Sequence, residues 1–105
     1  MRGPFALSAI CVDMVVPPKG RGVYGLSNSR DFVEVLKRTD LSVREELKSY
    51  ENEYKYFWFE LATSDHEAYN IESEEYHSHR TRKTETIPHP HAPADSDWHC
   101  PVCHQ

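Results

Sequence analysis

Residues 54–61, YKYFWFEL, and the segment that follows, residues 64–76 (SDHEAYNIESEEY), decide how this chain is expected to fold. The first stretch is rich in aromatic residues, which favour β-strands and supply much of the apolar surface of a small protein. It predicts a strand over residues 54–62 at the centre of a sheet. The second stretch has Glu67 three residues after Ser64, a capping-box pattern that predicts the start of a helix.

The helix predicted after this strand carries a carboxylate on the face that should turn inward. Ala68, Glu72 and Tyr76 follow one another at intervals of four and therefore share one side of the helix. A carboxylate on an inward face loses its hydration, so it needs a cationic partner, a metal ion or a proton. Glu72 is thus either a metal-binding candidate or a structural acid paired with Arg38, Arg44 or a tyrosine hydroxyl.

The preceding sequence predicts two further strands and one helix. Residues 1–21 form an apolar lead-in that ends in a proline-containing turn. Strands are expected over residues 22–26 and 31–38, and the polar turn SNSR between them suggests a β-hairpin. A second capping-box pattern, SVRE, begins a helix expected over residues 42–50.

The expected fold class is α/β of the α+β kind, with a small three-stranded, mostly antiparallel sheet flanked by helices in the order β-β-α-β-α. A chain of 105 residues, of which 38% are apolar, supports one small domain. We expect this domain over residues 1–80. A proline- and histidine-rich tail, residues 81–105, should pack along its surface.

Net charge, apolar runs and cysteine content argue against several classes of protein. The formal net charge of −5 argues against a strongly basic nucleic-acid binder, although Lys37, Arg38 and Arg44 form a local basic cluster. No apolar run reaches the length of a membrane span, and Asp13 interrupts the apolar start, so neither a membrane protein nor a signal peptide is expected. Three cysteines, two of them in the sequence CPVC, suit a cytoplasmic chain better than a disulfide scaffold.

Several motifs together resemble the GIY-YIG nuclease superfamily, in particular its small bacterial stand-alone members. The tripeptide GVY at residues 22–24 matches the first half of the motif that names the superfamily. The sequence EAYNIE at residues 67–72 is similar to the stretch that carries its metal-binding glutamate, and the end of the chain from IPHP to CPVC is similar to the tail of those members. The expected β-β-α-β-α order also agrees with that superfamily.

The resemblance implies an endonuclease that cleaves phosphodiester bonds of DNA with Mg²⁺ or Mn²⁺. In that interpretation Tyr24 helps to activate the attacking water, and Glu72 holds the divalent cation. Arg44 stabilises charge on the phosphate, while Lys37 and Arg38 contact the substrate. A tyrosine, with an ordinary pKa of about 10, can act as a base only where nearby cations favour its phenolate.

The chain departs from the superfamily pattern at two of its catalytic positions. Without gaps, the second tyrosine of the motif falls on Val35, its glycine on Lys37 and the catalytic arginine on Glu46. A second register, with small loop changes, places Arg44 at the arginine position instead. Loss of a single transition-state donor costs about 2.7–4 kcal/mol in other enzymes, so the resemblance implies weakened or lost activity. Tyr24 is otherwise an aromatic residue that packs against residues 54–61.

The tail contains a second candidate site. Six of the seven histidines lie from His77 onward, and Cys100 and Cys103 form a CxxC pair flanked by His99 and His104. Two thiolates at this spacing, together with neighbouring imidazoles, can bind Zn²⁺. His89 or His91 is an alternative source of the remaining ligands. The competing interpretation is a tail docked through Trp98 with free or redox-active thiols.

Three functions therefore stay open at this point: a weakened DNA endonuclease, a non-catalytic module that binds nucleic acid or a protein partner, and a zinc-binding protein that acts through its tail. The nuclease depends on one arrangement. Tyr24, Glu72 and an arginine must face one cleft, with Glu46 excluded from the arginine's place.

Overall fold

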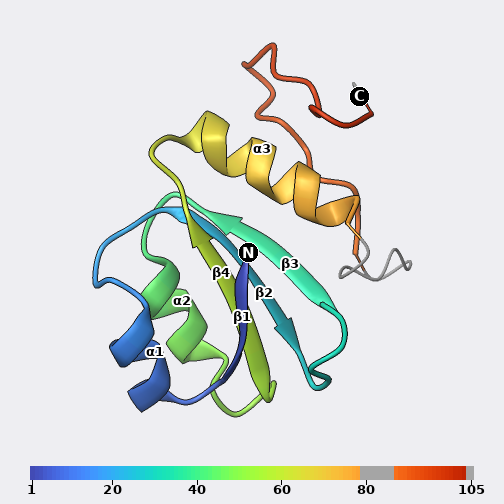
Figure 1. Cartoon of the computed structure of the whole chain (residues 1–105). Helices are drawn as coiled ribbons and strands as arrows, with labels where there is room; N and C mark the ends of the chain where they lie inside the picture. The colour runs from blue at the N-terminus through green and yellow to red at the C-terminus, as the bar shows by residue number, and fades with distance from the viewer. Residues whose placement is uncertain (79–86, 104–105) are drawn as a thin grey trace.

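The structure of the protein is a computed structural model that describes residues 1–78 and 87–103 (Figure 1). Over these residues the chain forms four strands and three helices. In chain order they are β1 (Arg2–Ala6), α1 (Ala9–Val15), β2 (Gly22–Ser27), β3 (Val35–Thr39), α2 (Val43–Ser49), β4 (Tyr56–Leu61) and α3 (Asp65–Tyr76). The predicted α+β class is confirmed.

Neighbouring strands of the sheet are antiparallel and lie in the order β1-β4-β2-β3. The aromatic strand β4 is thus internal, as predicted. Helices α1 and α2 cover one face of the sheet, whereas α3 lies on the opposite face (Figure 1). Because side chains alternate along a strand, each internal strand sends successive residues to opposite helical layers.

The apolar core lies between the sheet and the helices α1 and α2. Tyr24 and Leu26 point into it from β2, and Phe57 and Phe59 point into it from β4. The helices contribute apolar residues that are completely buried, namely Val12, Val43 and Leu47. This layer carries most of the hydrophobic stabilisation, since each fully buried large apolar side chain contributes about 1.5–3 kcal/mol.

The lead-in over residues 1–21 is more structured than the sequence predicts. It supplies β1, which pairs with β4 at one edge of the sheet, and α1, whose N-cap Ser8 accepts a hydrogen bond from the backbone N–H of Cys11. The described residues therefore follow the order β-α-β-β-α-β-α, and the prediction of a three-stranded sheet is wrong. Helix α1 has the same length as α2, but Cys11 rather than a glutamate follows three residues after its N-cap Ser8, so its start lacks the capping-box pattern that predicted α2.

The predicted hairpin is confirmed, because β2 and β3 pair directly. However, β3 begins at Val35 rather than at residue 31. The carboxylate of Glu34 accepts hydrogen bonds from the hydroxyl of Ser27, at 3.0 Å, and from the backbone N–H of Asn28, at 2.7 Å. These side-chain hydrogen bonds satisfy polar groups of the turn without strand pairing. The turn is therefore longer, and β3 begins later, than the sequence predicts.

Both predicted helix starts are confirmed. The side chain of Ser42 accepts a hydrogen bond from the backbone N–H of Glu45, and that of Ser64 accepts one from Glu67. Each cap satisfies one of the backbone donors that a helix start leaves unpaired.

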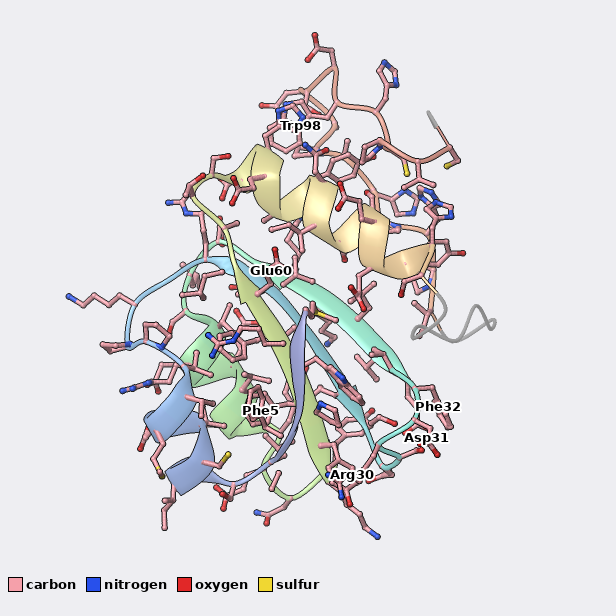
Figure 2. All side chains as sticks on the ribbon, in the orientation of Figure 1. Phe5, Arg30, Asp31, Phe32, Glu60 and Trp98 are labelled. Carbon is pink, nitrogen blue, oxygen red and sulfur yellow. The ribbon has the colours of Figure 1, made fainter. Side chains whose placement is uncertain are left out.

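The described part of the tail, residues 87–103, returns along α3 (Figures 1 and 2). The indole of Trp98 stacks on the imidazole of His66 with ring centroids 4.5 Å apart, and it also contacts Tyr69. Ile87 and Cys100 are buried. The tail is therefore packed against the helix at several points along its length.

Candidate functional site

Tyr24 lies on the helical layer formed by α1 and α2. Its side chain is buried, and its hydroxyl donates a hydrogen bond of 2.8 Å to the carboxylate of Glu46 in α2. Burial raises the pKa of Tyr24 well above its usual range, and the hydrogen bond and negative charge of Glu46 raise it further. The phenol thus stays protonated, and it acts as a donor to an acid rather than as a base.

Glu72 lies on the opposite side of the sheet. Its side chain projects from α3 and accepts a hydrogen bond of 2.9 Å from Arg38 in β3. Burial raises the pKa of Glu72 to about 6, although the positive charge of Arg38 opposes that effect. This contact is the arginine pairing that the sequence left open as an alternative to a metal role.

The register of the sheet explains why these two residues do not meet. Tyr24 is the cross-strand partner of Lys37, whereas Arg38, which binds Glu72, is opposite Val23. Adjacent positions on a strand face opposite sides, so the sheet separates Tyr24 from Glu72. The prediction that the two side chains face one cleft is wrong.

The basic residues assigned to the nuclease site also have other partners. Arg44 donates hydrogen bonds of 2.7 Å to the backbone carbonyl oxygens of Val16 and Asp13, and so it fastens α2 to the end of α1. Lys37 donates a hydrogen bond of 2.8 Å to the hydroxyl of Tyr50. No hydrogen bond joins either side chain to Glu72, and the charged residue that contacts the hydroxyl of Tyr24 is Glu46 rather than Arg44.

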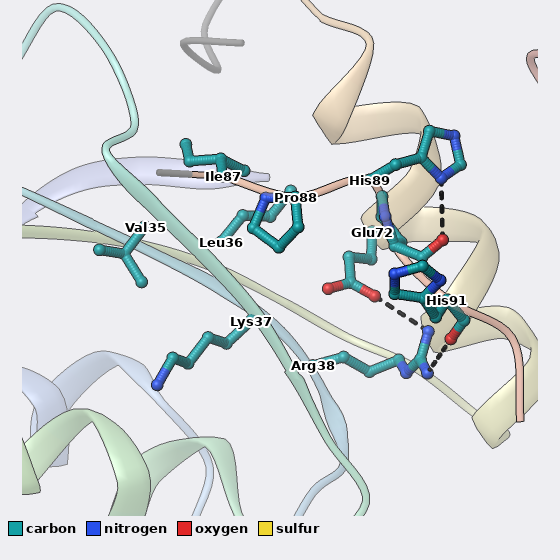
Figure 3. Close-up of a pocket in the computed structure, with 10 residues that line it drawn as sticks. Val35, Leu36, Lys37, Arg38, Glu72, Ile87, Pro88, His89 and His91 are labelled. Atoms are coloured by element: carbon teal, nitrogen blue, oxygen red, sulfur yellow. Dashed lines mark hydrogen bonds and ion pairs between the residues drawn. The ribbon is translucent and has the colours of Figure 1, made fainter. Parts of the chain in front are cut away.

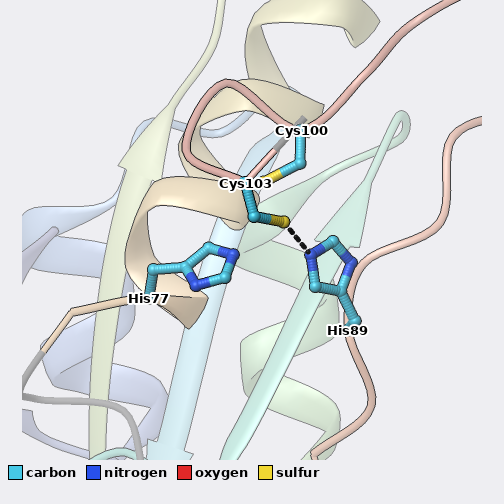
Figure 4. A group of neighbouring side chains, drawn as sticks. All are labelled: His77, His89, Cys100 and Cys103. Atoms are coloured by element: carbon cyan, nitrogen blue, oxygen red, sulfur yellow. Dashed lines mark hydrogen bonds between the residues drawn. The ribbon is translucent and has the colours of Figure 1, made fainter. Parts of the chain in front are cut away.

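A different group of side chains converges at the end of α3. His77 is the C-cap of that helix, His89 lies in the tail, and Cys100 and Cys103 come from the CxxC motif (Figure 4). Each offers one donor atom, and these atoms all lie within 4.8 Å of one another. Among the described residues this is the group of histidine, cysteine and acidic side chains that could hold a metal ion, and Glu72 is not part of it.

Hydrogen bonds around this cluster influence the tautomer of His89 and the pKa of Cys100. Nδ1 of His89 donates to the backbone carbonyl of Pro90 at 2.8 Å, which leaves the lone pair of Nε2 directed at Sγ of Cys103, 3.2 Å away. Burial raises the pKa of the Cys100 thiol, but backbone N–H groups of Cys103 and Val102 and the side chains of Cys103 and His77 outweigh it. The resulting pKa is about 6. A lowered pKa favours the thiolate, which is the form of cysteine that binds metal ions.

The cluster agrees in part with the metal ligands predicted from the sequence. Cys100 and Cys103 take part, and so does His89, which was one of two alternatives. His99 is exposed and lies outside the group, so that assignment is wrong, and His104 is outside the described residues. Sequence reasoning missed His77. The signal available was a histidine at the end of a predicted helix, where the chain could return to it.

No family model matches the chain, and neither the curated proteins nor the solved structures contain a match. The described residues contain no helix that is long and apolar enough to cross a bilayer. The three free cysteines, Cys11, Cys100 and Cys103, form no disulfide.

Proposed function

We propose that this protein binds one Zn²⁺ ion through His77, His89, Cys100 and Cys103, and that the ion fastens the tail to the end of α3. The convergence of the four donor atoms carries this proposal. Two sulfur and two nitrogen ligands are a set that zinc prefers, and four protein ligands without an open position are typical of a structural site.

The distances fit such a site after small movements. With Zn–S bonds of about 2.3 Å and Zn–N bonds of about 2.0–2.1 Å, tetrahedral ligand atoms lie about 3.3–3.8 Å apart. The group is at most 4.8 Å across, and the contact between Nε2 of His89 and Sγ of Cys103 is already 3.2 Å. The side chain of Cys103 is exposed and can therefore rotate toward the other ligands.

The surroundings of the ligands support the same proposal. Nδ1 of His89 binds a backbone carbonyl, which is the usual outer contact of a zinc-binding histidine because it fixes the tautomer and the ring orientation. Nε2 of His77 is buried and has no hydrogen-bond partner among the described residues. A buried ring nitrogen without a partner is costly, and a metal ion at the cluster would help to explain why this histidine is tolerated there.

The ion would act on folding rather than on a substrate. It would join the end of α3, the middle of the tail and the CxxC motif, segments that are distant in the sequence. Because the four ligands come together only in the folded chain, the free energy of metal binding contributes to the free energy of folding. We therefore propose a structural role, in which zinc keeps the tail against α3.

The geometry gives less support to DNA cleavage. That function needs a phenolate near a metal-bound carboxylate, whereas Tyr24 and Glu72 lie on opposite sides of the sheet and Glu46 holds the phenol protonated. A Mg²⁺ ion at Glu72 would also have to compete with the guanidinium of Arg38, 2.9 Å from the carboxylate. Within residues 1–78 and 87–103, no contact favours Mg²⁺ or DNA as a partner.

Elemental analysis of the purified chain tests the zinc proposal. We expect one zinc ion per chain, lost in Cys100→Ser and in His77→Ala. Two matched controls, Cys11→Ser and His99→Ala, remove the same residue types outside the cluster and should keep the metal. Co²⁺ substitution provides a second readout, since it should give the absorption bands of a tetrahedral thiolate site. Zinc below a tenth of an equivalent, or zinc retained in both ligand variants, would contradict the proposal.

A further inference from the structure

A cavity of about 430 Å³ lies between β3, α3 and the tail (Figure 3). Its apolar lining comes from Leu36 of β3 and from three tail residues, Ile87, Pro88 and Pro90. Cavities of about 300–1,000 Å³ with apolar walls and a few polar groups are typical of small-molecule sites. Of the four residues proposed to bind zinc, His89 also lines this cavity.

The polar groups of the cavity are unequally satisfied. Arg38 has three contacts: one terminal nitrogen donates to Oε1 of Glu72 at 2.9 Å, the other donates to the carbonyl oxygen of His91 at 2.8 Å, and the guanidinium lies over the ring of Tyr69. The second oxygen of Glu72, Oε2, has no hydrogen-bond partner among the described residues. In Figure 3 it points away from Arg38, toward the side of the cavity formed by Leu36 and Pro88.

An oxygen in this position is an acceptor that water or a ligand must satisfy. The side chain of Glu72 is only 12% exposed, so its carboxylate has lost most of its hydration and gains one arginine contact in return. Lys37 also borders the cavity, but its ammonium group is bound to Tyr50 on the other side of the sheet. The cavity therefore presents a carboxylate oxygen between two kinds of wall: Arg38, His89 and His91 on one side, and the apolar residues Leu36, Ile87, Pro88 and Pro90 on the other.

We propose that this pocket binds a small organic cation, namely an ammonium or amidinium group on a compact apolar body, with Oε2 of Glu72 as the acceptor for its N–H. The apolar body contacts Leu36, Ile87 and the two prolines, while the charged group completes the pairing of the carboxylate. The proposal rests on the proposed zinc site in one respect. His89 is both a zinc ligand and a wall of the cavity, so the ion holds the tail side of the pocket in place.

Titration of the zinc-loaded full chain with benzylamine, followed by amide chemical shifts, tests this assignment. For a ligand of this size we expect a dissociation constant of about a millimolar or tighter, with the largest shifts at Leu36, Glu72 and Ile87. Benzyl alcohol has nearly the same shape without the charge and should bind at least tenfold more weakly. Glu72→Gln should weaken benzylamine binding at least tenfold. Glu74→Gln, which removes an exposed acid from the same helix, should not.

Equal affinity for benzylamine and benzyl alcohol would overturn the proposal, and so would unchanged benzylamine binding in Glu72→Gln. The comparison of the two probes uses the unaltered chain, so it decides the matter even if the variant does not fold. Displacement of benzylamine by Mg²⁺ at an equal or lower concentration would also overturn it, because the site would then be a metal site.

Zinc content measured on the same samples separates this proposal from the first. One zinc ion per chain without benzylamine binding overturns the pocket assignment alone. Benzylamine binding to a chain that takes up no zinc overturns the zinc assignment alone.

Discussion

Two polar clusters of this protein differ in how their members satisfy one another. Beside Tyr24, each donor faces an acceptor: the phenol donates a hydrogen bond to Glu46, and the ammonium group of Lys37 donates one to Tyr50. At the end of α3, four atoms that could bind a metal ion lie within 4.8 Å of one another, and one of the buried ring nitrogens, Nε2 of His77, makes no hydrogen bond within the described chain. The first cluster is complete as it stands. For the second, we propose that a metal ion completes the contacts.

The comparison shows why candidate residues are better judged by their partners than by their identity. Tyr24 and Glu72 were candidates because of their residue types, yet Tyr24 is paired with Glu46 and Glu72 with Arg38, on opposite sides of the sheet. The histidines and cysteines of the tail carry no specific sequence motif beyond one CxxC pair. Their donor atoms nevertheless converge, which is the geometric condition for binding a metal ion.

The largest expected effect is at the Cys/His cluster. When free zinc exceeds its dissociation constant a thousandfold, it should stabilise the fold by about 4 kcal/mol relative to the metal-free chain, provided that the unfolded chain does not bind it. Chelation should therefore lower the free energy of unfolding by that amount and shift the emission of Trp98, which stacks on His66 in the docked tail. Urea denaturation with and without a chelator measures the change in the free energy of unfolding. Fluorescence of a Trp58→Phe variant, in which Trp98 is the remaining tryptophan, measures the shift in emission. Identical denaturation curves with and without the chelator would show that no metal ion stabilises the Cys/His cluster.

A smaller effect is expected from the protonation of Glu72. Its pKa is raised from 4.5 to about 6, so the folded chain binds this proton more tightly than the unfolded chain does. Stability from this group is present below pH 4.5 and is lost as the pH rises through 6, by about 2 kcal/mol in total. In the presence of a chelator, the stability of Glu72→Gln relative to the unaltered chain should rise by this amount between pH 4 and pH 7.5. A difference that does not vary with pH would show that the carboxylate is fully compensated.

A still smaller effect is expected at Tyr24. The Tyr24→Phe change removes the hydrogen bond to Glu46 but keeps the buried ring, so the free energy of unfolding should fall by about 1–2 kcal/mol. Tyr54→Phe is the matched control, because the described residues offer its hydroxyl no hydrogen bond, and it should change stability by less than about 0.5 kcal/mol. A Tyr24→Phe variant as stable as the unaltered chain would show that this cluster is less complete than its geometry indicates.

The smallest expected effect is on DNA. Incubation of supercoiled plasmid with Mg²⁺ and the purified chain should give no nicking above that of a Glu72→Ala variant. The unaltered chain and the variant should show the same low level of nicking, because the phenol of Tyr24 and the carboxylate of Glu72 lie on opposite sides of the sheet. Nicking that requires Mg²⁺ and disappears in both Glu72→Ala and Tyr24→Phe would reverse the comparison and restore the nuclease interpretation.

Part of the fold is readable from local patterns. The two capping boxes start helices at Ser42 and Ser64, and the aromatic run forms an internal strand, because these signals depend on residues close together in the sequence. The strand and helix of the lead-in were missed. Their stability comes from pairing with β4 and packing on α2, contacts that no local pattern contains.

The candidate sites divide in the same way. The CxxC pair and the inward position of Glu72 could be predicted, since both follow from spacing along the chain. The partner of Glu72 remained a choice among several groups until the register of β3 placed Arg38 beside it. His77 could not be assigned as a ligand, because nothing in the sequence says where the tail returns to the helix.

The sequence by itself determined the α+β class, the two later helices, the aromatic strand and the residue types of both clusters. Tertiary structure alone decided which of these residues meet. Side-chain alternation placed Tyr24 and Glu72 on opposite sides of the sheet, and the return of the tail along α3 joined His77 and His89 to the two cysteines. The reason is that spacing along a chain fixes local direction, whereas contact between distant segments depends on strand register and packing.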